Sequence, residues 1–209
     1  MSHSLHRMGT VENLQNDYTI IVRPERGYNN IGSREKQQKV LQALYDCHAC
    51  NITAARGDKF SGNIYETDIV NIVDGVGEGQ SVFAAFDSQE NLENFLMFLI
   101  KEDFGLSVVV QGLCKNVNDS LSRVGLKQHT TNHSLGIWGK KSLLQDNHIL
   151  EVTTMCGHGL VSPYLVMKCV DDVKSGHSTA HDAAVILSKV CICGIFNTTR
   201  AQELIEALI

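Results

Sequence analysis

The stretch from Ser81 to Val110 reads SVFAAFDSQENLENFLMFLIKEDFGLSVVV and predicts a strand, a helix and a second strand in succession. Ser81–Phe86 is rich in apolar and aromatic residues, as strands are. Asp87 or Ser88 can cap a helix that Gly105 ends, and Leu106–Val110 predicts a buried strand. Residues at the core-facing helical spacing are Leu92, Phe95, Leu96, Leu99 and Ile100. The unit indicates helices packed on a sheet.

The sequence before this unit predicts further elements of both kinds. Tyr18–Val22 predicts a strand, and Ser33 is expected to cap a helix that ends near Cys47. A loop is expected at residues 57–62. Ile69–Val73 is expected to form a hairpin with residues 81–86, because glycines at positions 75, 77 and 79 separate the two runs.

Two more strands are expected after the opening unit, at Leu135–Trp138 and Ile149–Met155. Helices separated by single strands imply crossover connections and therefore a mixed sheet. We expect an α+β fold, or alternatively an α/β fold, with a ferredoxin-like core around residues 81–155.

From residue 156 onward the composition becomes helical and predicts a bundle of three short helices. Ser162 followed by Pro163 is a typical helix start, and Thr179 with Asp182 resembles a capping box. No linker or repeat interrupts the chain. We therefore expect a mixed sheet domain over residues 1–155 and a helical subdomain that contains Cys and His, residues 156–209, packed on it.

Composition excludes several classes of function. The chain has 209 residues, a formal net charge of -5 and no basic run, which argues against nucleic-acid binding. No apolar stretch approaches the length of a membrane span, and the first residues lack the apolar core of a signal peptide. Gly75–Gly79 lacks the pattern of a dinucleotide-binding loop. We expect a cytoplasmic protein that can form a homo-oligomer and whose partner is a small molecule or a redox protein.

Seven cysteines, an odd number without a secretory signal, indicate free thiols rather than a disulfide framework. Cys156-Gly-His158-Gly and Cys191-Ile-Cys193-Gly stand at the two ends of a predicted helical hairpin. Each helix spans roughly 12 residues, or about 18 Å, so an antiparallel hairpin returns the second pair to the first. We expect Cys156, His158, Cys191 and Cys193 to be metal ligands, and the three cysteines to hold an iron–sulfur cluster or zinc.

We expect the metal site to serve redox chemistry or substrate binding, but two alternative hypotheses remain. Cys156 follows a strand in this prediction and precedes a helix, so it could be a catalytic nucleophile with His129 or His133 as its base. In a third hypothesis the cysteines only pack, in a ligand-binding or assembly module. Cys47 and Cys50 have the spacing of a metal-binding pair, but nothing in the sequence shows that they meet Cys191 and Cys193.

Overall fold

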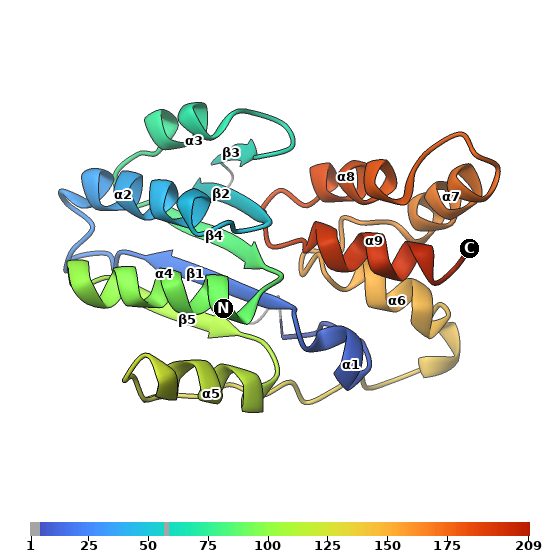
Figure 1. The fold of residues 1–209 in the computed structure, drawn as a ribbon, viewed down its shortest axis with the longest axis horizontal. Coiled ribbons are helices and arrows are strands. Elements are labelled where there is room, and N and C mark those ends of the chain that lie inside the picture. The colour runs from blue at the N-terminus through green and yellow to red at the C-terminus, as the bar shows by residue number, and fades with distance from the viewer. Residues whose placement is uncertain (1–4, 57–58) are drawn as a thin grey trace.

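The computed structural model describes residues 5–56 and 59–209, and over these residues the protein is α+β (Figure 1). Its strands are β1 (Tyr18–Arg23), β2 (Asn51–Arg56), β3 (Lys59–Asn63), β4 (Ser81–Phe86) and β5 (Ser107–Gln111). Its α-helices are α1 (Val11–Leu14), α2 (Ser33–Asp46), α3 (Ile69–Gly75), α4 (Gln89–Glu102), α5 (Cys114–Arg123), α6 (Asn147–Thr153), α7 (Pro163–Lys174), α8 (Ala180–Val190) and α9 (Thr198–Glu206), with a 3-10 turn at Lys141–Leu143.

The strands form one sheet in the order β3-β2-β4-β1-β5. Every neighbouring pair in it is antiparallel, so the prediction of a mixed sheet was wrong. Strands β1 and β2 do run in the same direction, because both are antiparallel to β4. They do not pair with each other, since β4 lies between them.

The two faces of the sheet belong to two separate cores. Tyr18, Ile20 and Val22 of β1 pack with α2 and α4, whereas Ile21 points to the opposite face and joins the core of the C-terminal helices. On that second face, register places Thr53, Phe83, Ile21 and Val109 in one row across four strands. Helices α6 to α9 gather beside the sheet in Figure 1.

Several predicted helix starts are confirmed. The side chain of Ser88 accepts the N–H of Asn91 at the start of α4, and Ser162 caps α7 with Pro163 at its first position. Thr179 accepts the N–H of Asp182 at the start of α8. The cap of α2 differs from the prediction, since Gly32, in the left-handed conformation, precedes Ser33.

Three predicted strands are wrong. Residues 69–73 form helix α3, and residues 149–155 lie largely within α6, whose start Asp146 caps by accepting the N–H of His148. Residues 135–138 have no regular structure. The predicted ferredoxin-like arrangement around residues 81–155 therefore lacks two of its strands.

Part of the predicted loop at residues 57–62 is strand β3; residues 57 and 58 lie outside the described residues. The predicted boundary at residue 156 stays a prediction, although Val152 of α6 already belongs to the same core as α7 to α9.

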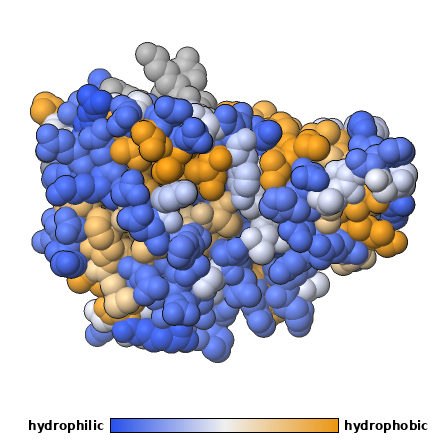
Figure 2. All heavy atoms as spheres, turned by 45° about the horizontal axis from the view of Figure 1, so that its top comes forward, coloured by the Kyte–Doolittle hydropathy of each residue, from blue (hydrophilic) through white to orange (hydrophobic). Residues whose placement is uncertain are grey.

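The surface in Figure 2 is mainly hydrophilic, with apolar side chains gathered in separate patches. The described residues form no helix with the length and hydrophobicity of a membrane span.

Candidate functional site

Three cysteines distant in sequence meet in the core of the C-terminal helices. Cys156 lies on the turn that follows α6, Cys191 is the C-cap of α8, and Cys193 lies on the turn before α9. The hairpin of α7 and α8 returns the chain to the end of α6. All three cysteines are buried, with 2% or less of each exposed.

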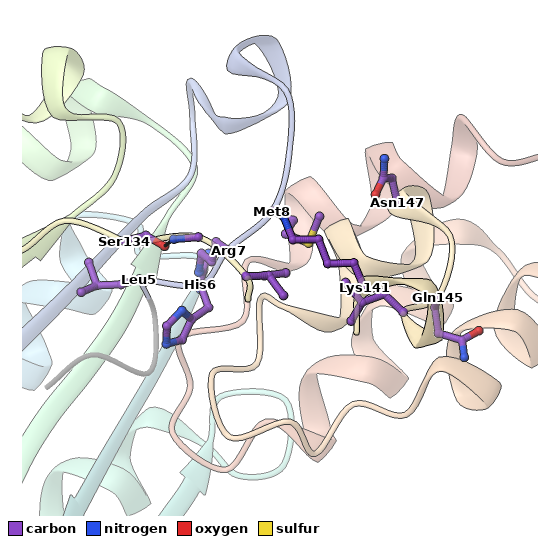
Figure 3. Close-up of a pocket in the computed structure, with 11 residues that line it drawn as sticks. Leu5, His6, Arg7, Met8, Ser134, Lys141, Gln145 and Asn147 are labelled. Atoms are coloured by element: carbon purple, nitrogen blue, oxygen red, sulfur yellow. Dashed lines mark hydrogen bonds between the residues drawn. The ribbon is translucent and has the colours of Figure 1, made fainter. Parts of the chain in front are cut away.

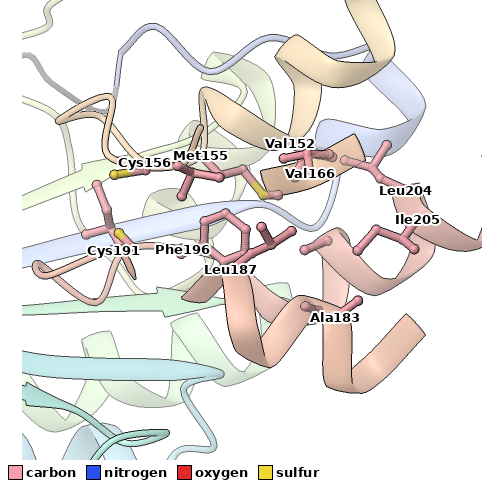
Figure 4. Close-up of a cluster of buried hydrophobic side chains, with 14 of the residues drawn as sticks. Val152, Met155, Cys156, Val166, Ala183, Leu187, Cys191, Phe196, Leu204 and Ile205 are labelled. Atoms are coloured by element: carbon pink, nitrogen blue, oxygen red, sulfur yellow. The ribbon is translucent and has the colours of Figure 1, made fainter. Parts of the chain in front are cut away.

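The thiols form a continuous chain of contacts. The Sγ atoms of Cys191 and Cys193 are 3.8 Å apart. Cys156 lies close enough to Cys191 for each thiol to shift the pKa of the other. Figure 4 shows Cys156 and Cys191 at one end of the apolar cluster that contains Leu187 and Phe196. The structure therefore brings together the three cysteines that the sequence analysis placed at the two ends of the hairpin.

Backbone N–H groups also point at the sulfurs. The N–H groups of Leu160 and His158 act to lower the pKa of Cys156, and that of Ile195 acts to lower the pKa of Cys193. The turn residues Gly159 and Gly194 make this possible, because both adopt the left-handed conformation. Such donors favour a thiolate over a thiol.

The pKa values show how the three thiols share protons. The hydrogen bond with Cys191, and then burial, raise the pKa of Cys156 far above its ordinary value. The hydrogen bond with Cys156 lowers the pKa of Cys191, but that with Cys193 and burial raise it, to about 12 overall. The hydrogen bond from Cys191 lowers the pKa of Cys193 in spite of burial. The three thiols therefore differ in pKa, and Cys193 is the most acidic of them.

Arg7 ties the two cysteine turns together, and sequence reasoning missed it. Its guanidinium donates to the backbone oxygen of Met155, at 3.2 Å, and to that of Ile195. Met155 precedes Cys156, and Ile195 lies two residues after Cys193. A charged side chain distant in sequence from both turns therefore fixes their relative position.

Asp17 holds Arg7 in place and was also missed. Its carboxylate pairs with Arg7 and with Arg200, the second pair at 3.0 Å, and its side chain is fully buried. Asn197, the N-cap of α9, donates to the same carboxylate at 3.1 Å. Only Asn197 could have been found in the sequence, because Asn is a favoured N-cap; no spacing pattern identifies Arg7 or Asp17.

The predicted histidines lie elsewhere. His158 is exposed and contributes its backbone N–H to Cys156. His129 and His133 are exposed, and Nδ1 of His133 is 3.6 Å from the Sγ of Cys114. Hydrogen bonds among the described residues connect neither His129 nor His133 to Cys156.

Cys156, Cys191 and Cys193 are called the thiol cluster below. The contacts of Cys47, Cys50 and Cys169 do not connect them to it. The Sγ of Cys50 donates to the backbone oxygen of Ala85, at 3.3 Å, and lies 3.6 Å from Oδ1 of Asn197. Cys47 packs against the core on the other face of the sheet. Cys169 lies in the same core as the cluster, where burial raises its pKa.

Over residues 5–56 and 59–209, no group of three or more His, Cys, Asp or Glu side chains is arranged to hold a metal ion. Comparison of the chain with protein families, curated proteins and solved structures finds no match. The function must therefore be argued from the thiol cluster itself.

Gly194 is the residue of the cluster least able to accept a side chain. A Cβ there would lie 3.0 Å from the backbone carbon of Ile52 and from two side-chain atoms of Thr53, because the Cys193 turn presses on β2. We expect Gly194→Ala to lower the free energy of unfolding by about 2–4 kcal/mol, through the left-handed backbone and the clash together.

Gly159→Ala is the matched control for this prediction. Gly159 has a similar backbone conformation, but nothing lies within 4 Å of a Cβ built there. It should cost only the backbone strain, about 1–2 kcal/mol. Urea denaturation of the two variants measures the difference, and equal losses would show that the turn does not press on β2.

Proposed function

We propose that the thiol cluster binds a metal, as zinc or as an iron–sulfur cluster, through Cys156, Cys191 and Cys193. The observation that carries the proposal is the convergence of three sulfurs from two separate turns. Buried cysteines that only pack need no such convergence, as Cys169 illustrates in the same core.

The separation of Cys191 and Cys193 supports two ligands on one metal ion. Sulfurs about 2.3 Å from a tetrahedral metal lie about 3.8 Å apart. The two Sγ atoms are 3.8 Å apart without a metal. Two hydrogen-bonded thiols have a similar Sγ–Sγ distance, so the metal content of the protein is the quantity to measure.

The N–H groups that point at Cys156 and Cys193 also support the proposal. Metal ligands are thiolates, and hydrogen bonds to sulfur stabilise them and tune a cluster. The positive charge of Arg7 also lowers the pKa of Cys191 and Cys193, by a smaller amount, and so favours their thiolates. These groups would hold thiolates ready for a cation.

Metal binding requires a local change. Cys156 and Cys191, whose pKa values are both raised, must each give up a proton, because a coordinating thiol is deprotonated. The fourth ligand would be His158 or an external molecule. Four protein ligands would give a structural or electron-transfer site, whereas an external ligand would allow substrate binding or redox chemistry with a small molecule or partner protein.

The alternative of a Cys156 nucleophile has less support. A nucleophilic cysteine needs a lowered pKa and access to its substrate. Cys156 has a raised pKa and is 2% exposed. We also propose that the protein is cytoplasmic, because free thiols persist in a reducing compartment.

We also propose that β1, β2, β4 and β5 with α2 and α4 make a ferredoxin-like unit over residues 18–111, with the C-terminal helices as a bundle on its second face. The antiparallel order β2-β4-β1-β5 and the helix that follows β1 and β4 support this assignment. A fold shared by many functions does not by itself identify this one.

The test is the metal content and absorption spectrum of protein purified without oxygen. We expect about one equivalent of zinc, or iron with sulfide and a broad visible absorbance that reductant bleaches. Protein that is colourless and free of transition metal, and that takes up neither zinc nor iron with sulfide, would overturn the proposal.

A further inference from the structure

A pocket of about 480 Å³ opens between the N-terminal segment and residues 134–147. Figure 3 shows side chains that line it. Its lining residues are Leu5, His6, Arg7, Met8, Ser134, Gly136, Ile137, Lys141, Leu144, Gln145 and Asn147. This volume falls within the range of pockets that bind small organic molecules.

The lining is basic although the whole chain is acidic. It contains His6, Arg7 and Lys141 but neither aspartate nor glutamate, while the chain carries a net charge of -5. Ser134, Gln145 and Asn147 add side chains that can donate hydrogen bonds. Leu5, Met8, Ile137 and Leu144 supply apolar surface. Such a lining suits a molecule with an anionic group and an apolar part.

Arg7 is a fixed cation in this wall. Only 8% of its side chain is exposed, and its buried Nε has no hydrogen-bond partner among the described residues. Its terminal nitrogens are occupied by Asp17, Met155 and Ile195. The three hydrogen bonds leave two of the five guanidinium N–H groups unused, and the one on Nε is buried, where an unpaired donor is costly.

The charge of Asp17 is shared between two guanidinium groups, Arg7 and Arg200. Burial is the main reason that the pKa of Arg200 is lowered, and the positive charge of Arg7 lowers it further. The negative charges of Asp17 and Glu151 act in the opposite direction and raise this pKa. Arg7 and Arg200 thus share the carboxylate of Asp17, and Glu151 adds a second negative charge near Arg200.

We propose that this pocket binds a small organic anion, whose carboxylate or phosphate lies against Arg7 and Lys141 and whose apolar part contacts the leucines and Ile137. The inference is independent of a metal at the thiol cluster. Arg7 nevertheless connects the two places, because it holds the turns of Cys156 and Cys193. A ligand here would bind one side chain away from the thiols.

Trp138 provides the readout. It is the only tryptophan of the chain, it is exposed, and it follows the lining residue Ile137. Phenyl phosphate and benzoate are suitable probes, because each joins an anionic group to an apolar ring; benzyl alcohol is the uncharged control. Fluorescence titration is paired with equilibrium dialysis, which counts bound probe directly.

We expect saturable binding of phenyl phosphate or benzoate, and none of benzyl alcohol. Lys141→Glu should weaken it at least tenfold, whereas Lys140→Glu should not, because Lys140 makes the same charge change one residue away and does not line the pocket. The tighter probe identifies a phosphate or a carboxylate ligand. Absence of binding by both methods, or equal loss in the two variants, would overturn the proposal.

Discussion

Replacing Asp17 by alanine is expected to lower the free energy of unfolding by about 3–5 kcal/mol. The fully buried carboxylate of Asp17 pairs with Arg7 and Arg200, whose side chains are 8% and 2% exposed. Without it, two buried guanidinium groups lose their counter-charge, and Asn197 loses an acceptor. Urea denaturation followed by circular dichroism measures the change.

Asp119→Ala is the control for this prediction. Asp119 also forms an ion pair, with Lys115 at 2.7 Å, but that pair lies on the exposed surface of α5. Exposed pairs contribute little, because water and salt screen them. Similar losses for Asp17→Ala and Asp119→Ala would show that the buried network does not hold the two cysteine turns.

The second large effect concerns metal retention. We expect Cys191→Ala and Cys193→Ala each to reduce the metal bound by protein purified without oxygen at least tenfold. Each variant removes one of the two sulfurs that are 3.8 Å apart and leaves only two of the three thiols. Alanine suits these sites, because both cysteines lie in an apolar core.

Cys169→Ala separates ligation from packing. Cys169 is buried in the same core, with 4% of it exposed, and lies outside the chain of thiol contacts. We expect the Cys169→Ala variant to lose about as much stability as the Cys191→Ala and Cys193→Ala variants and to keep its metal. If Cys169→Ala loses metal to the same extent, the loss reflects a damaged core, and the assignment of Cys191 and Cys193 as ligands fails.

The sequence was most informative where a helix has a side-chain cap. Ser88, Ser162 and Thr179 each accept a backbone N–H as predicted, and these local bonds do not depend on the rest of the fold. The caps at Ser162 and Thr179 fixed the hairpin of α7 and α8. That hairpin in turn led to the expectation that Cys156 approaches Cys191 and Cys193.

The errors occurred in short apolar runs whose period is ambiguous. Ile149 and Val152 are three residues apart and share a helical face, but the β-branched residues around them resemble a strand. Asp146, which caps this helix, was overlooked. Residues 69–73 were predicted as a strand for the same reason and form a helix. The prediction of a mixed sheet was wrong because crossover connections alone do not determine which strands pair.

Arg7 and Asp17 lay beyond sequence reasoning for a different reason. Their partners are Met155, Ile195 and Arg200, more than 140 residues away along the chain, and an ion pair leaves no periodic pattern. Only the folded arrangement shows that Arg7 binds the turns of Cys156 and Cys193 and that the N-terminal segment forms one wall of the adjacent pocket.

The most direct test of the account is X-ray absorption at the metal edge of the protein purified without oxygen. It reports the kind, number and distance of the ligand atoms around the metal. We predict at least three sulfur ligands at about 2.3 Å. A shell of nitrogen and oxygen alone, or the same sulfur shell after both Cys191 and Cys193 are replaced by alanine, would contradict it.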